Sequence, residues 1–377
     1  MEDWLICRVL TSYTDPDVVF YRERCTMDKT KRLVACPVLI MALTFCGKRT
    51  QPVDLTPDAL PSMPTDVRLI AFGSCNRQNL DQSYWRDIAG LQPDLWIWLG
   101  DNIYADTDDM EVMASMYAQQ KTDPNYAIFR RQVPIVGIWD DHDYGVNDGG
   151  KEYPEKEASK ELMLQFLDVP EDAPVRRHAG IYQNYTIQSD GHPVRLILLD
   201  TRSFRDALEP KPEGPERYRI NPDGDILGEE QWQWLGQQLR DTAWELALIG
   251  GGYQFLHDQQ YFEKWANFPQ AHQRLLQMID SLAHHPVILL SGDRHIAEIA
   301  RKPLPHQTWP LYEVTASGLT HSYTAVNEPN QYREGPVLGQ KNMATLHLDW
   351  QAAKPQCIIT LHELDSIKPF YVDTVGF

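Results

Sequence analysis

The chain has 377 residues, enough for one large α/β domain or two smaller ones, and its 42% hydrophobic and 23% charged residues are typical of a folded globular protein. With 35 Lys and Arg against 53 Asp and Glu, the formal net charge is −18, so we expect no nucleic-acid-binding surface. A mean hydropathy of −0.45 excludes a polytopic membrane protein.

The first 65 residues are predicted to form a leader and a linker. Three basic residues between positions 29 and 32 precede the apolar run Leu33–Cys46. This run is shorter than the ~20 residues that cross a bilayer, but it fits the apolar core of a secretory signal. If translation begins at Met27, the basic stretch starts a signal peptide. We therefore expect an exported protein, periplasmic or at the cell surface. A cytosolic protein with a buried apolar segment is the alternative.

Cys46 lies where a bacterial lipoprotein carries its lipidated cysteine, so we also consider a membrane anchor at this residue. Phe45 fits this less well, because a small residue is expected immediately before such a cysteine. From Lys48 to Thr65 the chain is rich in Pro and Thr and shows no hydrophobic period, which indicates a linker.

Strands and helices alternate through the rest of the chain, which we assign to one domain, residues 66–377. Continuous apolar runs, typical of strands buried on both faces, occupy residues 67–73, 95–100, 134–139, 195–200, 244–250, 286–292, 310–317, 344–350 and 357–363. Helical patterns occupy residues 110–120, 155–167, 228–242 and 272–285. The alternation predicts βαβ units in a layered α/β sandwich. Strands from Leu311 onward lack intervening helices and are expected to pair antiparallel.

Polar clusters follow four of these strands directly. They are Gly73–Asn76, Gly100–Tyr104, Trp139–Asp143 and Gly292–His295. In open α/β sheets, functional groups gather just beyond the carboxyl ends of the strands, so we expect the four clusters to meet.

The acidic residues of these clusters indicate a metal site. A lone Asp after a strand is usually a helix cap, but Asp101, Asp141 and Asp293 recur at three strand ends, and His295 accompanies them. Converging carboxylates repel one another and need a cation between them. A pair of metals about 3.5–4 Å apart fits such a set. Oxygen ligands favour Ca²⁺, Mg²⁺, Mn²⁺ or Fe³⁺.

Three further residues in the clusters have a structural and a functional interpretation each. Cys75 is either a small buried hydrophobe or a thiolate ligand. Tyr104 is either a packing residue or a phenolate ligand to a ferric ion. His142 is either a salt-bridged surface residue or a proton donor whose pKa the neighbouring Asp residues raise.

The motifs together resemble the alkaline phosphatase D (PhoD-like) branch of the calcineurin-like metallophosphoesterases. The matching segments, GSCN, GDNIY, WDDHD, LDTRSFR and SGDRH, lie between Val67 and Ser317. Most metallophosphoesterases have Asp-x-His, Gly-Asn-His-Asp or -Glu, and Gly-His-x-His, where this chain has Ser74–Asn76, Asp140–Asp143 and Gly292–His295. These departures are those of the PhoD-like branch. The resemblance implies a layered α/β/β/α sandwich of the metallophosphoesterase type with mixed sheets.

The resemblance also implies a ferric ion paired with a calcium ion, with other divalent metals as the alternative. The implied iron ligands are Cys75, Asp101, Tyr104 and His295, with Asp101 bridging the two ions. Asp141 and Asp293 would face the calcium, and Asn102 would lie near either ion or the substrate.

One ligand of the superfamily has no counterpart in the sequence. Most metallophosphoesterases supply a further histidine after the fifth strand, where this chain has Gly250–Phe255. Gln254 lies in this segment, and its role is left open. Three arginines are candidates for holding phosphate oxygens, because guanidinium offers a bidentate fork. They are Arg77, Arg202 and Arg205, and Arg202 is preferred because it follows a strand directly.

We therefore expect a metal-dependent hydrolase of phosphate monoesters or diesters that uses a metal-activated hydroxide, with protonated His142 assisting the departing alcohol. Four aromatic residues in insertions, Tyr126, Phe129, Trp265 and Phe268, are expected to cover the site and favour small or lipid-like diesters. A monomer is expected. The alternative is a calcium-stabilised surface binding module with a degenerate catalytic site.

Overall fold

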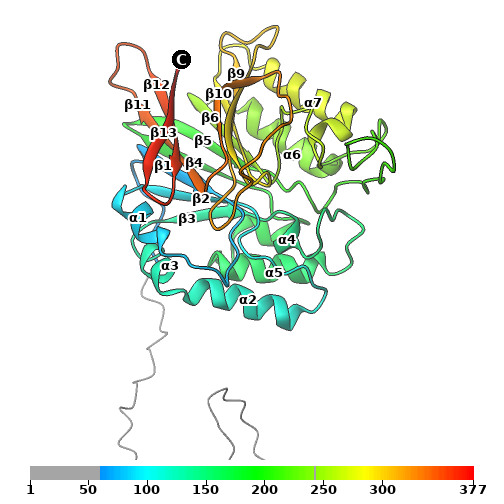
Figure 1. Ribbon diagram of the computed structural model, residues 1–377. Coiled ribbons are helices and arrows are strands. Elements are labelled where there is room, and N and C mark those ends of the chain that lie inside the picture. Colours follow the sequence, from blue (N-terminus) through cyan, green and yellow to red (C-terminus); the bar gives the residue numbers. More distant parts are fainter. Residues whose placement is uncertain (1–59, 242) are drawn as a thin grey trace, which may run out of the picture. The chain divides into compact units, whose positions relative to one another are not determined.

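Two mixed β-sheets form the centre of the fold (Figure 1). The computed structural model describes residues 60–241 and 243–377. Within these residues, the first sheet has the strand order β13-β12-β11-β1-β2-β3 and the second has the order β10-β8-β9-β7-β6-β5-β4. The first sheet comprises β1 (Leu69–Gly73), β2 (Leu95–Leu99), β3 (Ile135–Ile138), β11 (Asn342–Asp349), β12 (Gln356–Glu363) and β13 (Lys368–Gly376). The second comprises β4 (Gln183–Ser189), β5 (His192–Leu198), β6 (Leu246–Gly251), β7 (Val287–Ser291), β8 (Ala297–Lys302), β9 (Leu311–Ala316) and β10 (Arg333–Leu338).

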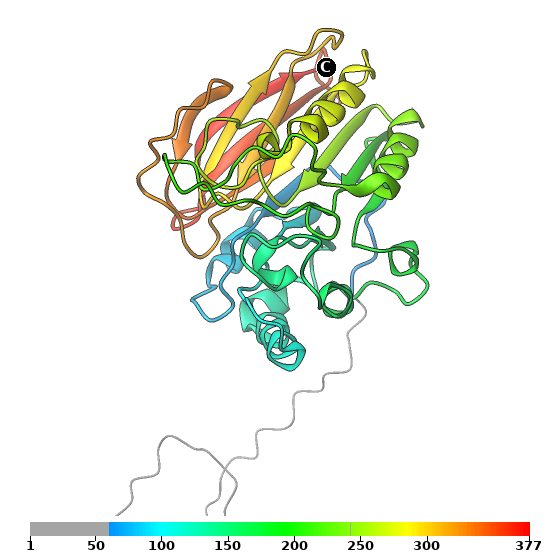
Figure 2. The same cartoon turned by 90° about the vertical axis from the view of Figure 1, so that its right-hand side faces the viewer.

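Helices cover the outer faces of both sheets. On the first sheet they are α1 (Tyr84–Gly90), α2 (Met110–Thr122), α3 (Pro124–Phe129), α4 (Asp141–Tyr144) and α5 (Lys156–Phe166). On the second they are α6 (Gly228–Arg240) and α7 (Pro269–Asp280), with short 3₁₀ turns at Pro174–Arg177 and Trp265–Asn267. In Figure 2 the yellow helix α7 lies over strands of the second sheet, and the cyan helix α2 lies apart from it. The α/β/β/α sandwich expected from the sequence is confirmed.

Aromatic and aliphatic packing explains how the helices are held to the sheets. The centroid of the Trp85 ring of α1 lies 4.9 Å from that of Trp96 and 5.3 Å from that of Trp98, both of β2. On the other sheet, Leu235 of α6 and Leu275 of α7 belong to one fully buried apolar cluster with residues of β5, β6 and β7. The expected strands are almost wholly buried because they lie between two such layers.

The parallel strands of each sheet bring their carboxyl ends to one edge. β1, β2 and β3 are parallel neighbours, and so are β5, β6, β7 and β9. β9 corrects the expectation that every strand from Leu311 onward pairs antiparallel. The chain first returns along β8, which is antiparallel to β9, and so β9 runs in the same direction as β7 without an intervening helix. The strands β10 to β13 do pair antiparallel.

The four aromatic residues expected to cover the site are core residues instead. Tyr126 and Phe129 pack against Trp85, and Trp265 and Phe268 lie in the apolar cluster under α6 and α7, each at most 1% exposed. Burying their large apolar surface against the sheets is more favourable than leaving it at the rim of a polar site. These four residues therefore give no reason to expect a lipid-like substrate.

The leader and anchor predictions stay predictions, because Met27 and Cys46 lie outside the described residues. Within residues 60–241 and 243–377, none of the helices has the length and apolar character required to span a bilayer.

Candidate metal centre

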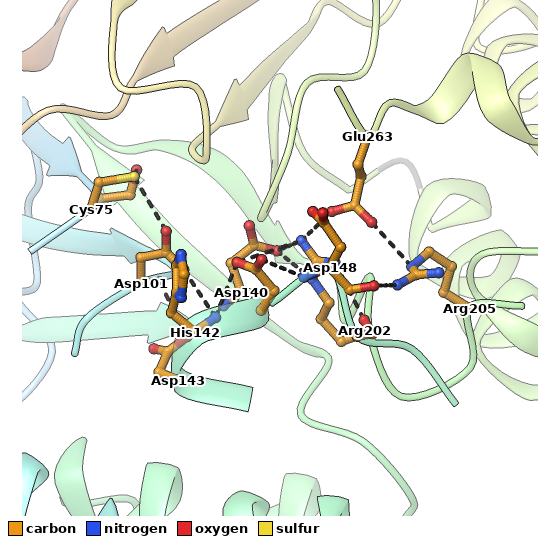
Figure 3. Close-up of polar contacts among 12 residues, drawn as sticks. Cys75, Asp101, Asp140, His142, Asp143, Asp148, Arg202, Arg205 and Glu263 are labelled. Carbon is orange, nitrogen blue, oxygen red and sulfur yellow. Dashed lines mark hydrogen bonds and ion pairs between the residues drawn. The ribbon is translucent and has the colours of Figure 1, made fainter. Parts of the chain in front are cut away.

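Loops at the strand ends bring the predicted ligands together from both sheets. Cys75 follows β1, Asp101 follows β2 and Asp141 follows β3, while Asp293 and His295 follow β7. Figure 3 shows Cys75, Asp101 and His142 side by side, with a chain of charged residues extending from Asp140 to Arg205. The parallel register of the strands, and not their order in the sequence, determines this meeting.

One group of donors surrounds the carboxylate of Asp101. The Asp101 Oδ2 atom lies 3.4 Å from Cys75 Sγ and 3.2 Å from the Tyr104 hydroxyl, which is 3.4 Å from His295 Nε2. One ligand atom each of Cys75, Asp101 and His295 lie within 4.8 Å of one another. The four residues predicted for the iron therefore form one cluster.

A second group shares Asp101 with the first. Ligand atoms of Asp101, Asp141 and His142 also lie within 4.8 Å of one another, and the His142 backbone N–H donates to Asp101 Oδ1 at 3.4 Å. The two oxygens of Asp101 thus face different neighbours, which is the arrangement that a bridging carboxylate requires. Asp293 lies beside this group, and its Oδ2 atom is buried without a hydrogen-bond partner among the described residues.

Four of the clustered residues have a left-handed backbone conformation that favours glycine. The φ angles are 60° for Cys75, 50° for Asp101, 69° for Asp293 and 54° for His295. Such conformations are costly for residues with a Cβ atom and persist where a function requires the side chain. Their concentration at one place marks this region as the functional site.

The charges of the metal-free cluster are unbalanced. Burial raises the pKa of Asp101 well above its usual value, raises the pKa of Asp293 to about 8, and raises the pKa of the Cys75 thiol. Burial also lowers the pKa of His295 to about 3, so this imidazole is neutral and able to bind a metal. A cation among these groups would favour the ionised carboxylates and thiolate. The donor set therefore fits a metal.

His142 carries a positive charge in this arrangement. Burial lowers its pKa, but the carboxylates of Asp101, Asp141 and Asp106 outweigh burial and raise the pKa to about 10. The Nδ1 atom lies 2.8 Å from both oxygens of Asp106, so the other ring nitrogen is left for another partner. The expected direction of the pKa shift is confirmed. Asp106 was not found from the sequence, because an Asp in a loop carries no distinguishing pattern.

Asn102 uses its side-chain N–H group for structural contacts, whereas its Oδ1 atom is buried without a hydrogen-bond partner among the described residues. Its Nδ2 atom donates to Ile138 O at 3.0 Å and to Asp143 Oδ2 at 2.6 Å. Asp143 also accepts from the backbone N–H groups of Asp101, Asn102 and Asp140. Asp143 thus ties the loop after β2 to the loop after β3, and Asn102 is part of this connection. The role of Asn102 at an ion or substrate stays a prediction, for which the Oδ1 atom is available.

Arg202, which the sequence analysis preferred as a phosphate ligand, is buried in ion pairs instead. Its side chain is 0% exposed, its Nε donates to Asp140 Oδ1 at 2.6 Å, and its NH2 lies 2.5 Å from Glu263 Oε1 (Figure 3). The guanidinium is fully engaged by two buried carboxylates and has no access to a substrate. Arg205 is buried on the other side of Glu263, at 3.3 Å.

Arg77 is the one of the three arginines that lies exposed beside the metal cluster. Its guanidinium lies 4.5 Å from the centroid of the Tyr104 ring. Among the residues that the structure describes, it forms no ion pair with a carboxylate. Arg77 is therefore better placed than Arg202 to bind an anionic group.

The role of Gln254, in the segment after β6, stays open, because its Oε1 atom is buried without a hydrogen-bond partner among the described residues. The Gln254 Nε2 atom donates to Glu298 Oε1 at 2.7 Å and to Thr315 Oγ1 at 3.0 Å, within a buried network behind the cluster. A histidine missed by the sequence analysis lies nearby. The His321 ring is 4.3 Å from the His295 ring and 5.1 Å from the Tyr104 ring. His321 follows β9, and this position at the end of a strand could have identified it from the sequence.

We predict that Arg202→Met destabilises the protein by about 3–5 kcal/mol, because it leaves Asp140 and Glu263 buried without their cation. The measurement is the free energy of unfolding in urea. The control, Arg274→Met, removes an exposed pair with Glu229 and should cost at most about 1 kcal/mol. An Arg202→Met protein with wild-type stability and weakened phosphate binding would contradict the structural role.

Comparisons with known proteins identify the family. The sequence model of the PhoD-like phosphatases matches residues 70–355. Alkaline phosphatase D of Bacillus subtilis (strain 168) is 25% identical over 300 residues, covering 66% of this chain and 49% of the relative. The chain thus spans about half the length of this curated relative.

Three solved structures share the fold. A structure of PhoD superposes with a TM-score of 0.60 at 18% identity, covering 84% of this chain and 73% of the other. Purple acid phosphatase PPD1 from yellow lupin (Lupinus luteus) seeds gives 0.59 at 12% identity, covering 84% and 55%. A dimetal phosphatase from Danio rerio gives 0.55 at 11% identity, covering 83% and 99%. Together with the family match, these findings establish that the chain belongs to the PhoD-like phosphatase family.

Proposed function

We propose that the protein is a metal-dependent phosphoester hydrolase with a binuclear centre. One observation carries the proposal: the Asp101 carboxylate lies within 4.8 Å of ligand atoms of Cys75 and His295 and also of Asp141, and the His142 ring lies beside these carboxylates. Two adjacent metals with a proton donor at their edge are suited to in-line displacement at phosphorus. Membership of the family supports the same activity.

Cys75, Asp101, Tyr104 and His295 would hold one ion, and Asp101, Asp141 and Asp293 the other. The thiolate and phenolate donors favour iron at the first position, and the carboxylate oxygens favour calcium at the second. When bound, the ions supply the positive charge that activates water and neutralises the phosphoryl oxygens.

His142 would protonate the departing alcohol. Asp106 accepts the Nδ1–H of His142 and thereby fixes the ring, which lies 4.0 Å from the Tyr104 ring. The remaining N–H is then directed away from Asp106 and can be given to a leaving oxygen. A structurally fixed donor is more effective than water, because its orientation is not lost at each turnover.

Arg77 would hold a phosphate oxygen at the rim of the centre. Its backbone N–H donates to Thr320 Oγ1 at 2.8 Å, which anchors the residue, while the guanidinium stays exposed over Tyr104. Both monoesters and diesters of small alcohols are proposed as substrates. No observation favours the alternative of an inactive binding module.

We expect Asp101→Ala to abolish hydrolysis and to lose both metals, because one carboxylate serves both groups. Turnover of chromogenic aryl phosphate monoesters and diesters and metal content by mass spectrometry measure this. Asp108→Ala, which removes an exposed Asp of the same loop, is the matched control. Two retained metals with normal turnover would refute the bridging role. A wild type that hydrolyses no phosphoester but melts at a lower temperature after chelation would favour the binding module.

Cys75→Ser should remove a visible charge-transfer absorption of the concentrated protein and reduce turnover by orders of magnitude, because a thiolate ligand to ferric iron is lost. Calcium content should persist, since Asp141 and Asp293 are unchanged. The control is Cys357→Ser, which alters the other described free and buried cysteine, far from these carboxylates in β12. A colourless, iron-free wild type that is fully active with another divalent ion would overturn the iron assignment alone.

Arg77→Ala should raise KM and the inhibition constant of inorganic phosphate by about 10-fold or more, because a charge-assisted hydrogen bond to phosphate is worth about 1.5–3 kcal/mol. Arg86→Ala, an equal change of charge on the exposed side of α1, should leave both unchanged. Equal effects of the two variants would show that only the overall charge matters.

A further inference from the structure

The loop that follows β9 is hydrogen-bonded to two of the three loops that carry the iron-group ligands, those after β1 and β7. The Leu319 N–H donates to Ser74 O at 3.2 Å and the Thr320 N–H to Cys75 O at 3.4 Å. Further along, the Tyr323 N–H donates to His295 O at 2.9 Å. His321 lies between these attachments, and none of the roles proposed above uses it.

The hydrogen bonds of Thr320 determine which nitrogen of His321 carries the proton. A hydroxyl has one proton and two lone pairs. The Thr320 hydroxyl donates to Cys75 O at 3.2 Å and accepts the Arg77 N–H at 2.8 Å, and His321 Nδ1 is 3.0 Å from the same oxygen. Because the hydroxyl proton is already used, His321 Nδ1 must donate. The Nε2 atom of His321 therefore presents a lone pair.

This lone pair has no donor among the described residues, although it is buried. His321 Nε2 is enclosed by the protein and makes no hydrogen bond there. A buried acceptor without a partner is costly, so its persistence points to a partner that forms in another state of the site.

His295 also has a buried ring nitrogen without a hydrogen-bond partner. Its Nε2 atom lies 3.4 Å from the Tyr104 hydroxyl, on the side of the ligand cluster. Its Nδ1 atom is buried and has no hydrogen-bond partner among the residues that the structure describes. When Nε2 binds a metal, the neutral ring must carry its proton on Nδ1. This N–H then needs an acceptor, as ligating histidines generally have.

We infer that His321 Nε2 accepts the Nδ1–H of His295 when the metal is bound, so that Thr320, His321 and His295 form a chain of hydrogen bonds ending at the ion. The centroids of the two rings lie 4.3 Å apart and the ring planes are at 66° to each other, so the two rings are already in edge-to-face contact. His321 is thus a positioning residue that fixes the orientation of His295 and raises its basicity. This inference rests on the metal centre of the proposed function.

The test compares two variants that differ only at the acceptor. His321→Asn retains a donor to Thr320 Oγ1 but places no acceptor near the position of Nε2, whereas His321→Gln places a carbonyl oxygen there. Iron content after dialysis against graded concentrations of a chelator gives the relative affinities. His321→Asn should bind iron 10–100-fold more weakly, about the loss that follows removal of such an outer partner, and His321→Gln should recover most of it.

A control histidine makes the same contact elsewhere. His284 Nδ1 lies 2.9 Å from Thr308 Oγ1 at an exposed position, so His284→Asn should leave iron affinity unchanged. Wild-type affinity of His321→Asn would overturn the inference. So would equal losses in the Asn and Gln variants with a lower melting temperature of the metal-free protein, because a merely structural role predicts them. If the wild type binds iron but hydrolyses no phosphoester, the proposed function fails while the affinities still decide the role of His321.

Discussion

Repulsion between buried carboxylates is the constraint on which this structure depends. Six acidic side chains gather in the loops and strands around the centre, five of them buried and Asp293 partly exposed: Asp101, Asp140, Asp141, Asp143, Asp293 and Glu263. The protein compensates them in three different ways. Backbone N–H groups surround Asp143, and the guanidinium groups of Arg202 and Arg205 neutralise Asp140 and Glu263. Asp101 accepts from the Cys75 thiol, the Tyr104 hydroxyl and the His142 backbone, and Asp293 Oδ2 has no hydrogen-bond partner among the described residues. For these two carboxylates the proposed metal ions are the third way.

The site therefore has one part whose carboxylates are compensated by arginine side chains of the fold, and one part whose carboxylates would be compensated by bound metal. The arginine pairs are fully buried and belong to the folded framework, where removing one charge would leave the other without compensation. The cluster around Asp101 carries the ligands proposed for the metals, so its charge balance would vary with metal supply. The two parts are joined at the adjacent residues Asp140 and Asp141, because Arg202 lies 2.6 Å from Asp140 Oδ1 and 4.0 Å from Asp141 Oδ1.

Nine of the thirteen strands in the described residues, most helices and the meeting of the polar clusters were predictable because their signals are local, whereas β4, β8, β10 and β13 were not expected. Continuous apolar runs identify buried strands, and a polar cluster at the end of each run places its side chains at a shared edge. The partners of Arg202 were not predictable, since Glu263 reaches it from a distant loop with no pattern of its own. Tyr126 and Trp265 were misplaced for a similar reason, because sequence position does not tell whether an aromatic residue in an insertion turns inward. His321 could have been found by applying the strand-end argument to β9 as well.

The left-handed conformations of Cys75, Asp101, Asp293 and His295 set a limit on how stable this fold can be without losing its chemistry. Glycine would relax the backbone at each of these positions, and a search for thermostable sequences would therefore favour it. Each such replacement would also delete a ligand. The site thus lies where selection for durability and selection for metal binding oppose each other, and stabilising substitutions that spare activity have to be sought in the sheets and helices away from these four turns.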